Sequence, residues 1–199
     1  MEFLFSKNNN LKEEINPWKI NHSKEVYNNN WIRVTEHDVV NPSGNNGIYG
    51  VVHFKNTAVG VIPLDEENNT WLVGQYRFSL NQYSWEIPEG GAAFDEDPVK
   101  GAARELEEET GLKASIYTRI VEMHLSNSVS DEYAVVYLAQ GLSQHMATPE
   151  ETEQLVVKKV PFQTAYDMVE QGIITDSMSV AAILKVKLML LQQELPEVS

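Results

Sequence analysis

Residues 97–111, DPVKGAARELEEETG, fold most readily as a helix, because both ends carry the residues that bound one. Asp97 is a favourable N-cap, Pro98 suits the first turn, and Gly111 can end the helix in a left-handed conformation. We therefore predict a helix from Pro98 to Thr110. Apolar and small residues recur at spacings of three and four and give it one buried stripe: Val99, Ala102, Ala103, Leu106 and Thr110.

A second face of this helix is acidic. Glu105, Glu108 and Glu109 stand away from the apolar stripe at spacings that bring their carboxylates together, where repulsion costs ~0.2–0.5 kcal/mol per pair. A divalent cation would turn that repulsion into coordination, since hard cations prefer carboxylate oxygens. Arg104 can reach Glu108 one turn on, and Gly101 leaves the approach to Glu105 open. A solvated acidic face without a metal is the alternative.

The charge of the whole chain also favours a cation. Its 199 residues include 15 Lys and Arg against 29 Asp and Glu, a formal net charge of -14. Such a surface repels nucleic acid and anionic membranes, so we expect neither as a partner. An anionic substrate would need positive charge between itself and the protein. Cysteine is absent, which excludes disulfides, a thiolate nucleophile and sulfur-ligated zinc.

Length and hydrophobicity favour one compact domain with a small appendage, because 42% hydrophobic residues suffice for a sizeable core. The first residues, MEFLFSKNNNLKEE, have no basic lead-in and no small-residue cleavage site. No apolar run approaches membrane-spanning length. We therefore expect a cytoplasmic protein that does not associate with membranes.

The order of the remaining elements predicts an α+β fold. The first thirty residues are rich in Asn and Lys, and we expect them to be loosely structured. Two further helices are expected over 161–172 and 176–193, the latter capped by Asp176 or Ser177. Strands, one helix, more strands and two helices imply helices about a mixed sheet. The β-type runs are 31–40, 47–54, 58–64, 70–78, 115–125 and 132–142.

The acidic helix is the second half of a longer motif at residues 90–112. Every fixed position of the Nudix box is matched by Gly90, Glu96, Arg104, Glu105, Leu106, Glu108, Glu109, Gly111 and Leu112. The chain thus resembles the Nudix hydrolases. The resemblance implies an α/β/α sandwich around a mixed sheet, here with an N-terminal β extension. It also implies a divalent metal, usually Mg²⁺ or Mn²⁺, and hydrolysis of a nucleoside diphosphate linked to another group.

Carried over by position, the resemblance assigns the metal ligands. Glu105 and Glu109 are expected to bind the ion through their side chains, and Glu108 to bridge ions or support a ligand. The carbonyl oxygen of Glu89 would add a ligand. Arg104, with Glu96, is expected to organise the catalytic loop and helix by hydrogen bonds.

The stretch before the box, VGQYRFSLNQYSWEIPEGG, resembles ADP-ribose pyrophosphatases and related nucleotide-sugar hydrolases. Arg77 has a planar fork that pairs with phosphate oxygens, and Glu86 would support a metal or the terminal ribose. For the aromatic matches, packing in the core is the alternative to substrate contact. The matching residues are Tyr76, Arg77, Trp85, Glu86 and Pro88.

Two later segments complete the predicted site. In the family, a late loop supplies a catalytic carboxylate and a further metal ligand, which fall on Glu151 and Glu153 of PEETE. Whether Glu151, Glu153 or Glu108 is the general base stays open, and a plain acidic loop is the alternative. Glu132 matches a substrate-binding glutamate. Its loop, LSNSVSDE, lacks the Pro and Gly that ADP-ribose pyrophosphatases often have there.

The resemblance implies cleavage of ADP-ribose or a related nucleoside diphosphate sugar into a nucleoside monophosphate and a sugar phosphate. A hydrolase for GDP-mannose or another nucleotide hexose is the alternative within the family. A non-catalytic nucleotide-sugar sensor is the alternative from another class. Relatives are usually homodimers with crossing N-terminal strands, so we expect residues 1–45 to serve dimerisation and 46–199 to form the Nudix hydrolase domain.

Overall fold

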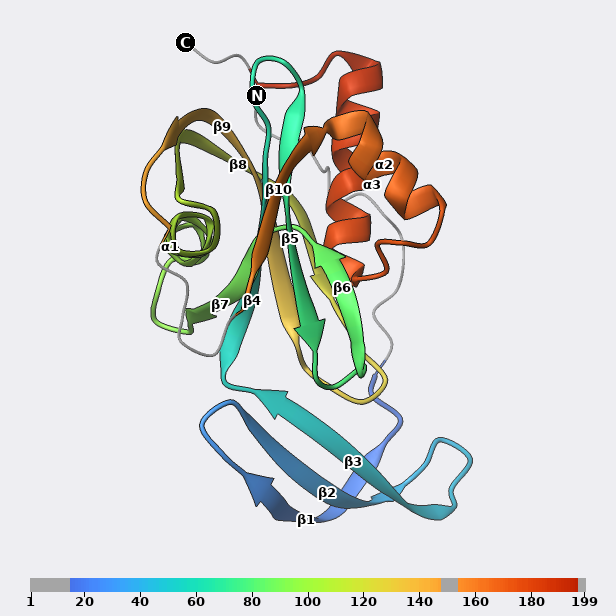
Figure 1. Cartoon of the computed structure of the whole chain (residues 1–199). Coiled ribbons are helices and arrows are strands. Elements are labelled where there is room, and N and C mark those ends of the chain that lie inside the picture. The colour runs from blue at the N-terminus through green and yellow to red at the C-terminus, as the bar shows by residue number, and fades with distance from the viewer. Residues whose placement is uncertain (1–14, 148–153, 197–199) are drawn as a thin grey trace.

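The computed structural model describes residues 15–147 and 154–196, which form three sheets and three helices (Figure 1). In chain order the elements are β1 (Lys19–Asn28), β2 (Ile32–Val40), β3 (Asn46–Phe54), β4 (Asn56–Pro63), β5 (Asn69–Arg77), β6 (Gln82–Glu86), β7 (Glu89–Ala93), α1 (Pro98–Thr110), β8 (Leu112–His124), β9 (Tyr133–Gln144), β10 (Val156–Pro161), α2 (Phe162–Glu170) and α3 (Ser177–Gln192).

The central sheet has the order β7-β4-β9-β8 and is mixed, since β4 and β9 are parallel and the other pairs are antiparallel. Strand β9 shows why its sequence is a nearly continuous apolar run. Val135 and Tyr137 pack in the cluster that includes α1, whereas Val136 and Leu138 pack in the cluster that includes α2 and α3. Both faces are therefore covered. Figure 1 shows these helices on opposite sides, as the predicted sandwich requires.

The helices begin and end where local sequence signals place them. The Asp97 side chain accepts a hydrogen bond from the N–H of Val99, and Gly111 ends α1 with φ 71°. Helix α3 is capped by Asp176, which accepts from the N–H of Ser179. All three predicted helices are confirmed, with bounds shifted by two residues at most.

Two expectations for α1 are wrong. Glu109 does not stand clear of the buried stripe but is only 2% exposed, because its carboxylate turns under the chain of β7. Gly101 does not leave space for an ion. It packs against β7, where an added Cβ would lie 2.6 Å from the Cβ of Ala92.

The N-terminal segment is more ordered than its composition predicts. Strand β1 lies within the first thirty residues and pairs antiparallel with β2, which pairs with β3 along its whole length. Every residue of β1 is exposed, and none of the three helices in the described residues covers this sheet (Figure 1). The boundary predicted between residues 45 and 46 falls at the turn before β3, whereas the three-stranded sheet continues to Phe54. Among the described residues, no helix is long and apolar enough to cross a membrane.

Candidate active site

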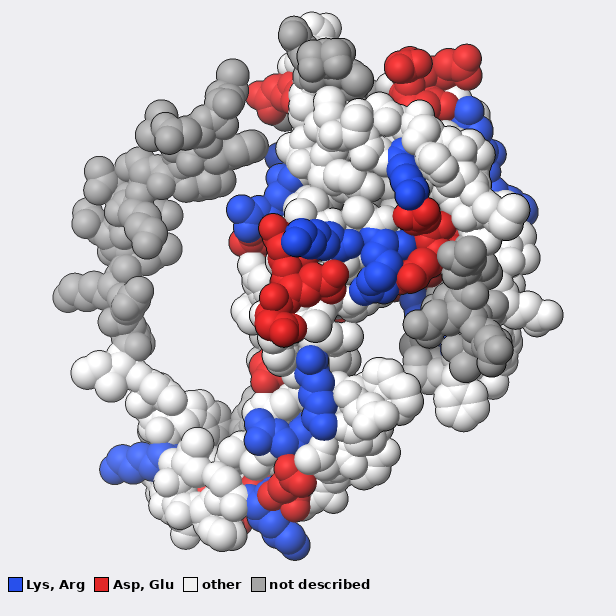
Figure 2. All heavy atoms as spheres, turned by 90° about the vertical axis from the view of Figure 1, so that its left-hand side faces the viewer, with Lys and Arg blue, Asp and Glu red and all other residues white. Residues whose placement is uncertain are grey.

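A cavity of about 570 Å³ brings together residues from both ends of the chain. The α1 face, which carries acidic and basic side chains side by side, is drawn in Figure 2. The residues that line the cavity come from the N-terminal turn, β4, β5, β7, α1, the β8–β9 loop and α3: Trp31, Asn56, Ala58, Gln75, Arg77, Glu89, Gly90, Gly91, Arg104, Glu105, Glu132 and Met178.

Strand β7 and helix α1 fit closely because the box glycine has no side chain. A Cβ added to Gly90 would lie 2.2 Å from the carboxyl carbon of Glu105. The N–H of Gly91 donates to Glu105 Oε1 at 3.2 Å, and the N–H of Glu89 donates to Glu109 Oε2 at 3.1 Å. The backbone of β7 thus orients two carboxylates of α1.

Arg104 holds the acidic face of α1 together. Its Nη1 donates to Glu105 Oε1 at 2.8 Å and to Glu108 Oε2 at 3.2 Å, so the contact predicted with Glu108 is present. Nη2 donates to the carbonyl oxygen of Gly91 at 2.7 Å and lies 4.0 Å from Glu96. Arg104 therefore links the helix to β7, which is the supporting arrangement that the resemblance implies.

The acidic face favours additional positive charge. Burial raises the pKa of Glu105, and the opposing effect of Arg104 and of the Gly91 N–H does not fully offset it. Glu108 contributes further repulsion. Within the described residues, no three acidic, cysteine or histidine side chains converge closely enough to hold an ion. The candidate metal ligands on this face are all oxygen atoms, which are the ligands that hard divalent cations prefer. Glu151 and Glu153 lie outside the described residues.

Arg77 is the second arginine of the cavity, and it is already paired with carboxylates. Its Nε donates to both oxygens of Glu86 at 2.9 and 3.0 Å, and Nη2 donates to Glu86 Oε2 at 2.6 Å. Nη2 also donates to Glu89 Oε1 at 2.7 Å. Glu86 is only 3% exposed and does not line the cavity. In this structure the Glu86 carboxylate contacts Arg77 and holds its guanidinium in place.

Carboxylates crowd the side of the cavity near α3. Burial raises the pKa of Glu89, and the neighbouring carboxylates of Asp176 and Glu86 outweigh the opposing effect of Arg77. Glu89 Oε2 is buried and accepts no hydrogen bond among the described residues. Burial and the Asp176 carboxylate also raise the pKa of Glu132. The crowding therefore favours the protonated, neutral forms of Glu89 and Glu132 on this wall.

Two further predicted substrate residues, besides Glu86, lie outside the cavity lining. Tyr76 points to the other side of β5 from Gln75 and Arg77, and its hydroxyl donates to Asn81 Oδ1 at 2.6 Å. Trp85 packs edge-on against Tyr83, with ring centroids 5.6 Å apart. Trp85 is partly buried against the core, which is the alternative for these aromatics, whereas Tyr76 is exposed to solvent.

Sequence reasoning missed several cavity residues. Gln75 had a usable signal, because it lies two residues before Arg77 and shares its face of β5. Trp31 and Met178 had none, since only the folded chain brings the β1–β2 turn and the start of α3 to the box helix.

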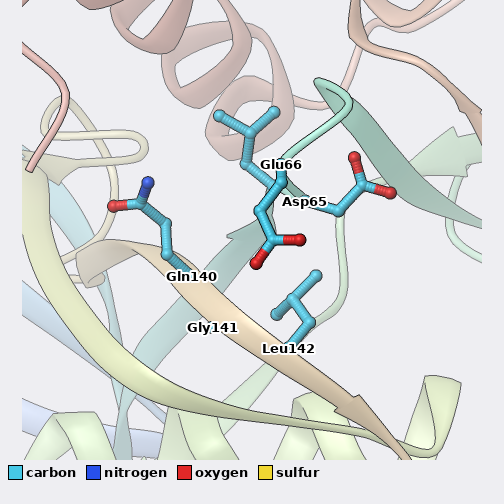
Figure 3. A pocket seen from close by; sticks show the side chains of 6 residues that line it. Asp65, Glu66, Gln140, Gly141 and Leu142 are labelled. Atoms are coloured by element: carbon cyan, nitrogen blue, oxygen red, sulfur yellow. The ribbon is translucent and has the colours of Figure 1, made fainter. Parts of the chain in front are cut away.

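A second hollow, of about 80 Å³, lies between the β4–β5 turn and β9 (Figure 3). It contains no residue of the Nudix box. The carboxylate of Asp65 is committed to the turn, where it accepts from the N–H groups of Glu67 and Asn69. The Gln140 side chain points away from Asp65 and Glu66 in Figure 3. The geometry does not converge on a ligand here.

The family comparisons agree with the site. A model of the NUDIX domain matches residues 54–174, and a model of the nucleoside diphosphate sugar hydrolase N-terminal domain matches residues 18–52. An ADP-ribose pyrophosphatase from Mycobacterium tuberculosis is 36% identical over 140 residues, which span 68% of this chain and 66% of that protein. A methanol dehydrogenase activator from Bacillus methanolicus is 30% identical over 163 residues, spanning 81% of this chain and 88% of that protein.

A solved structure has the same fold. The crystal structure of an ADP compounds hydrolase superposes with a TM-score of 0.80 at 20% identity, covering 92% of this chain and 100% of that one. This match confirms the fold alone, and the family model that spans most of the chain establishes its membership. The chain belongs to the Nudix family of hydrolases.

Proposed function

We propose that this enzyme hydrolyses the diphosphate bond of ADP-ribose or a related nucleoside diphosphate sugar, giving a nucleoside monophosphate and a sugar phosphate. The observation that carries the proposal is the cavity in which Glu105 of the box meets Arg77 and Arg104. The N-terminal family model and the ADP-ribose pyrophosphatase relative favour this substrate class.

The proposed cofactor is Mg²⁺ or Mn²⁺. Glu105, Glu108, Glu109 and the carbonyl oxygen of Glu89 would hold it, together with Glu153. When bound, such a cation neutralises the diphosphate and acidifies an attacking water. The general base is proposed to be Glu151, with Glu108 and Glu153 as the alternatives. Arg104 would keep Glu105 and Glu108 oriented throughout, through the contacts that it makes with both.

Arg77 is proposed to bind phosphate. Its hydrogen bonds to the described residues use Nε and Nη2, which leaves Nη1 for a phosphate oxygen. Glu86 and Glu89 keep the guanidinium in one orientation, so little side-chain entropy would be lost on binding. Glu132 lines the cavity and would accept hydrogen bonds from sugar hydroxyls.

A homodimer formed through the N-terminal sheet is part of the proposal. Large apolar side chains of this sheet are exposed in the single chain, including Ile20, Tyr27 and Ile48. A partner that covers them would remove apolar surface from water. Light scattering tests this, since an active enzyme that is purely monomeric would contradict it. The expected cytoplasmic location stays a prediction.

A substrate panel tests the function. ADP-ribose, GDP-mannose, other nucleotide sugars and nucleoside triphosphates are assayed with Mg²⁺, and the products are separated by chromatography. We expect AMP and ribose 5-phosphate from ADP-ribose. A strong preference for a nucleotide hexose would favour the alternative hydrolase. Tight binding of nucleotide sugars without cleavage of any would contradict the hydrolase proposal and favour the sensor.

A further inference from the structure

The loop between β8 and β9 is bound to the N-terminal sheet. The N–H of Val52 on β3 donates to the carbonyl oxygen of Val129 at 2.8 Å. In return, the N–H of Asp131 donates to the carbonyl oxygen of Val52 at 3.2 Å. The Tyr49 hydroxyl donates to the carbonyl oxygen of Ser128 at 2.6 Å. Figure 1 shows this loop reaching the N-terminal sheet. Two segments distant in sequence are thus joined by backbone contacts.

The Asp131 side chain adds further contacts between this loop and the end of β3. Its Oδ2 lies 2.6 Å from Nδ1 of His53, and its Oδ1 accepts the N–H of Phe54 at 3.0 Å. Partial burial alone would raise the pKa of Asp131, but the hydrogen bonds from His53 and Phe54 outweigh it and lower the pKa. One ionised carboxylate therefore binds both a side chain and the backbone at the end of β3.

The same corner of the chain positions two walls of the cavity. Glu132, the residue after Asp131, lines the cavity. Lys55, two residues after His53, donates its N–H to the carbonyl oxygen of Trp31 at 3.0 Å, and Trp31 also lines the cavity. Trp31 and Glu132 are consequently connected through the end of β3, rather than through the box helix.

The chemistry of these two walls suits the part of a substrate that is not phosphate. A carboxylate repels phosphate but accepts hydrogen bonds from sugar hydroxyls, and the face of an indole stacks on a base. Displacing such groups would lose a hydrogen bond to the sugar or a stacking contact with the base, and would therefore weaken substrate binding.

We propose that Asp131 is a positioning residue, which holds Glu132 and Trp31 in register through His53 and Phe54 and thereby sets the affinity for the nucleoside and sugar groups. This inference rests on the proposed function. Asp131 does not line the cavity and acts only through its neighbours. Its loss should therefore raise KM while kcat changes little, since the box glutamates and Arg104 are untouched.

Two substitutions of Asp131 test the proposal. Asp131→Ala removes both contacts and should raise KM for ADP-ribose about tenfold or more, which corresponds to the loss of about one binding contact, with kcat within about twofold. Asp131→Asn keeps an oxygen for the Phe54 N–H and should raise KM less. His53→Gln and Asp131→Asn should be non-additive in KM, because they break the same pair.

The matched control is Lys113→Gln, which breaks the exposed pair between Lys113 and Glu107, 3.0 Å apart and outside the cavity lining. It should leave both KM and kcat unchanged. An active wild-type enzyme whose Asp131 variants melt earlier but keep the wild-type KM would overturn the positioning role alone. A wild-type enzyme that cleaves no nucleotide sugar would overturn the proposed function and this inference with it.

Discussion

Among the box carboxylates, Glu109 is the one enclosed by protein, and it accepts the N–H of Glu89. Glu109→Gln keeps the volume and an oxygen acceptor but removes the charge. We expect kcat to fall by at least about 100-fold, since losing a ligand costs more than the 10–100-fold typical of groups that support ligands. Thermal melting and steady-state rates at saturating Mg²⁺ measure this. Retention of most of the rate would place the metal elsewhere.

Gly90 offers a second test at the residue scale, because the three atoms nearest to an added Cβ all belong to the carboxyl group of Glu105. Gly90→Ala should displace that carboxylate and lower activity about 10–100-fold, while the melting temperature falls by no more than a few degrees. The control is Gly50→Ala on β3, where an added Cβ has no neighbour within 4 Å. Equal activities of the two variants would argue against a fixed Glu105.

At the scale of elements, the β4–β5 turn should contribute stability that depends on pH. Burial would raise the pKa of Asp65, but Lys159 and the N–H of Asn69 lower it below 3.8. A carboxyl whose pKa is lowered by folding stabilises the fold above its unfolded pKa, and this stability is lost as the pH falls through the folded pKa.

Asp65→Asn should therefore reduce the free energy of unfolding at pH 7 by about 1 kcal/mol, the difference between hydrogen bonds to charged and neutral groups. The amide oxygen can still accept the N–H groups of the turn. Urea unfolding from pH 7 to pH 2 measures the difference, which should shrink below pH 4. A difference that stays constant down to pH 2 would exclude the charge as its cause.

Elements with strong local signals were predictable, and those without were not. Helix α1 carries its cap, its proline and its terminal glycine within fifteen residues, so its bounds follow from the sequence. Strand β1, KINHSKEVYN, has neither apolar alternation nor burial, because its order comes from pairing with β2. The box half of the site was predictable for the same reason. Trp31 and Met178 were not, since tertiary packing alone brings them to the cavity.

For the whole molecule, the net charge of -14 means that like charges repel one another in the folded state. We therefore expect bound cations to increase its stability. If Mg²⁺ binds the folded protein but not the unfolded chain, the free energy of unfolding should rise by about 2.7 kcal/mol at a Mg²⁺ concentration of 100 Kd. The melting temperature should rise more with MgCl₂ than with NaCl of equal ionic strength. In Glu105→Gln that difference should be largely lost. An equal response of wild type and variant would indicate general screening of charge.

The parallel pairing of β4 with β9 affects how the enzyme is made. Ala58 pairs with Ala134, and strands that pair in parallel need a long crossover between them. During synthesis β4 emerges from the ribosome before β9 has been made. One edge of the apolar strand β4 therefore stays unpaired until β9 follows. The cavity is completed later still, when Met178 of α3 joins Trp31 in its lining. Catalytic competence is therefore acquired only as the last helix docks, and a chain stalled before α3 would carry an intact Nudix box without a finished site.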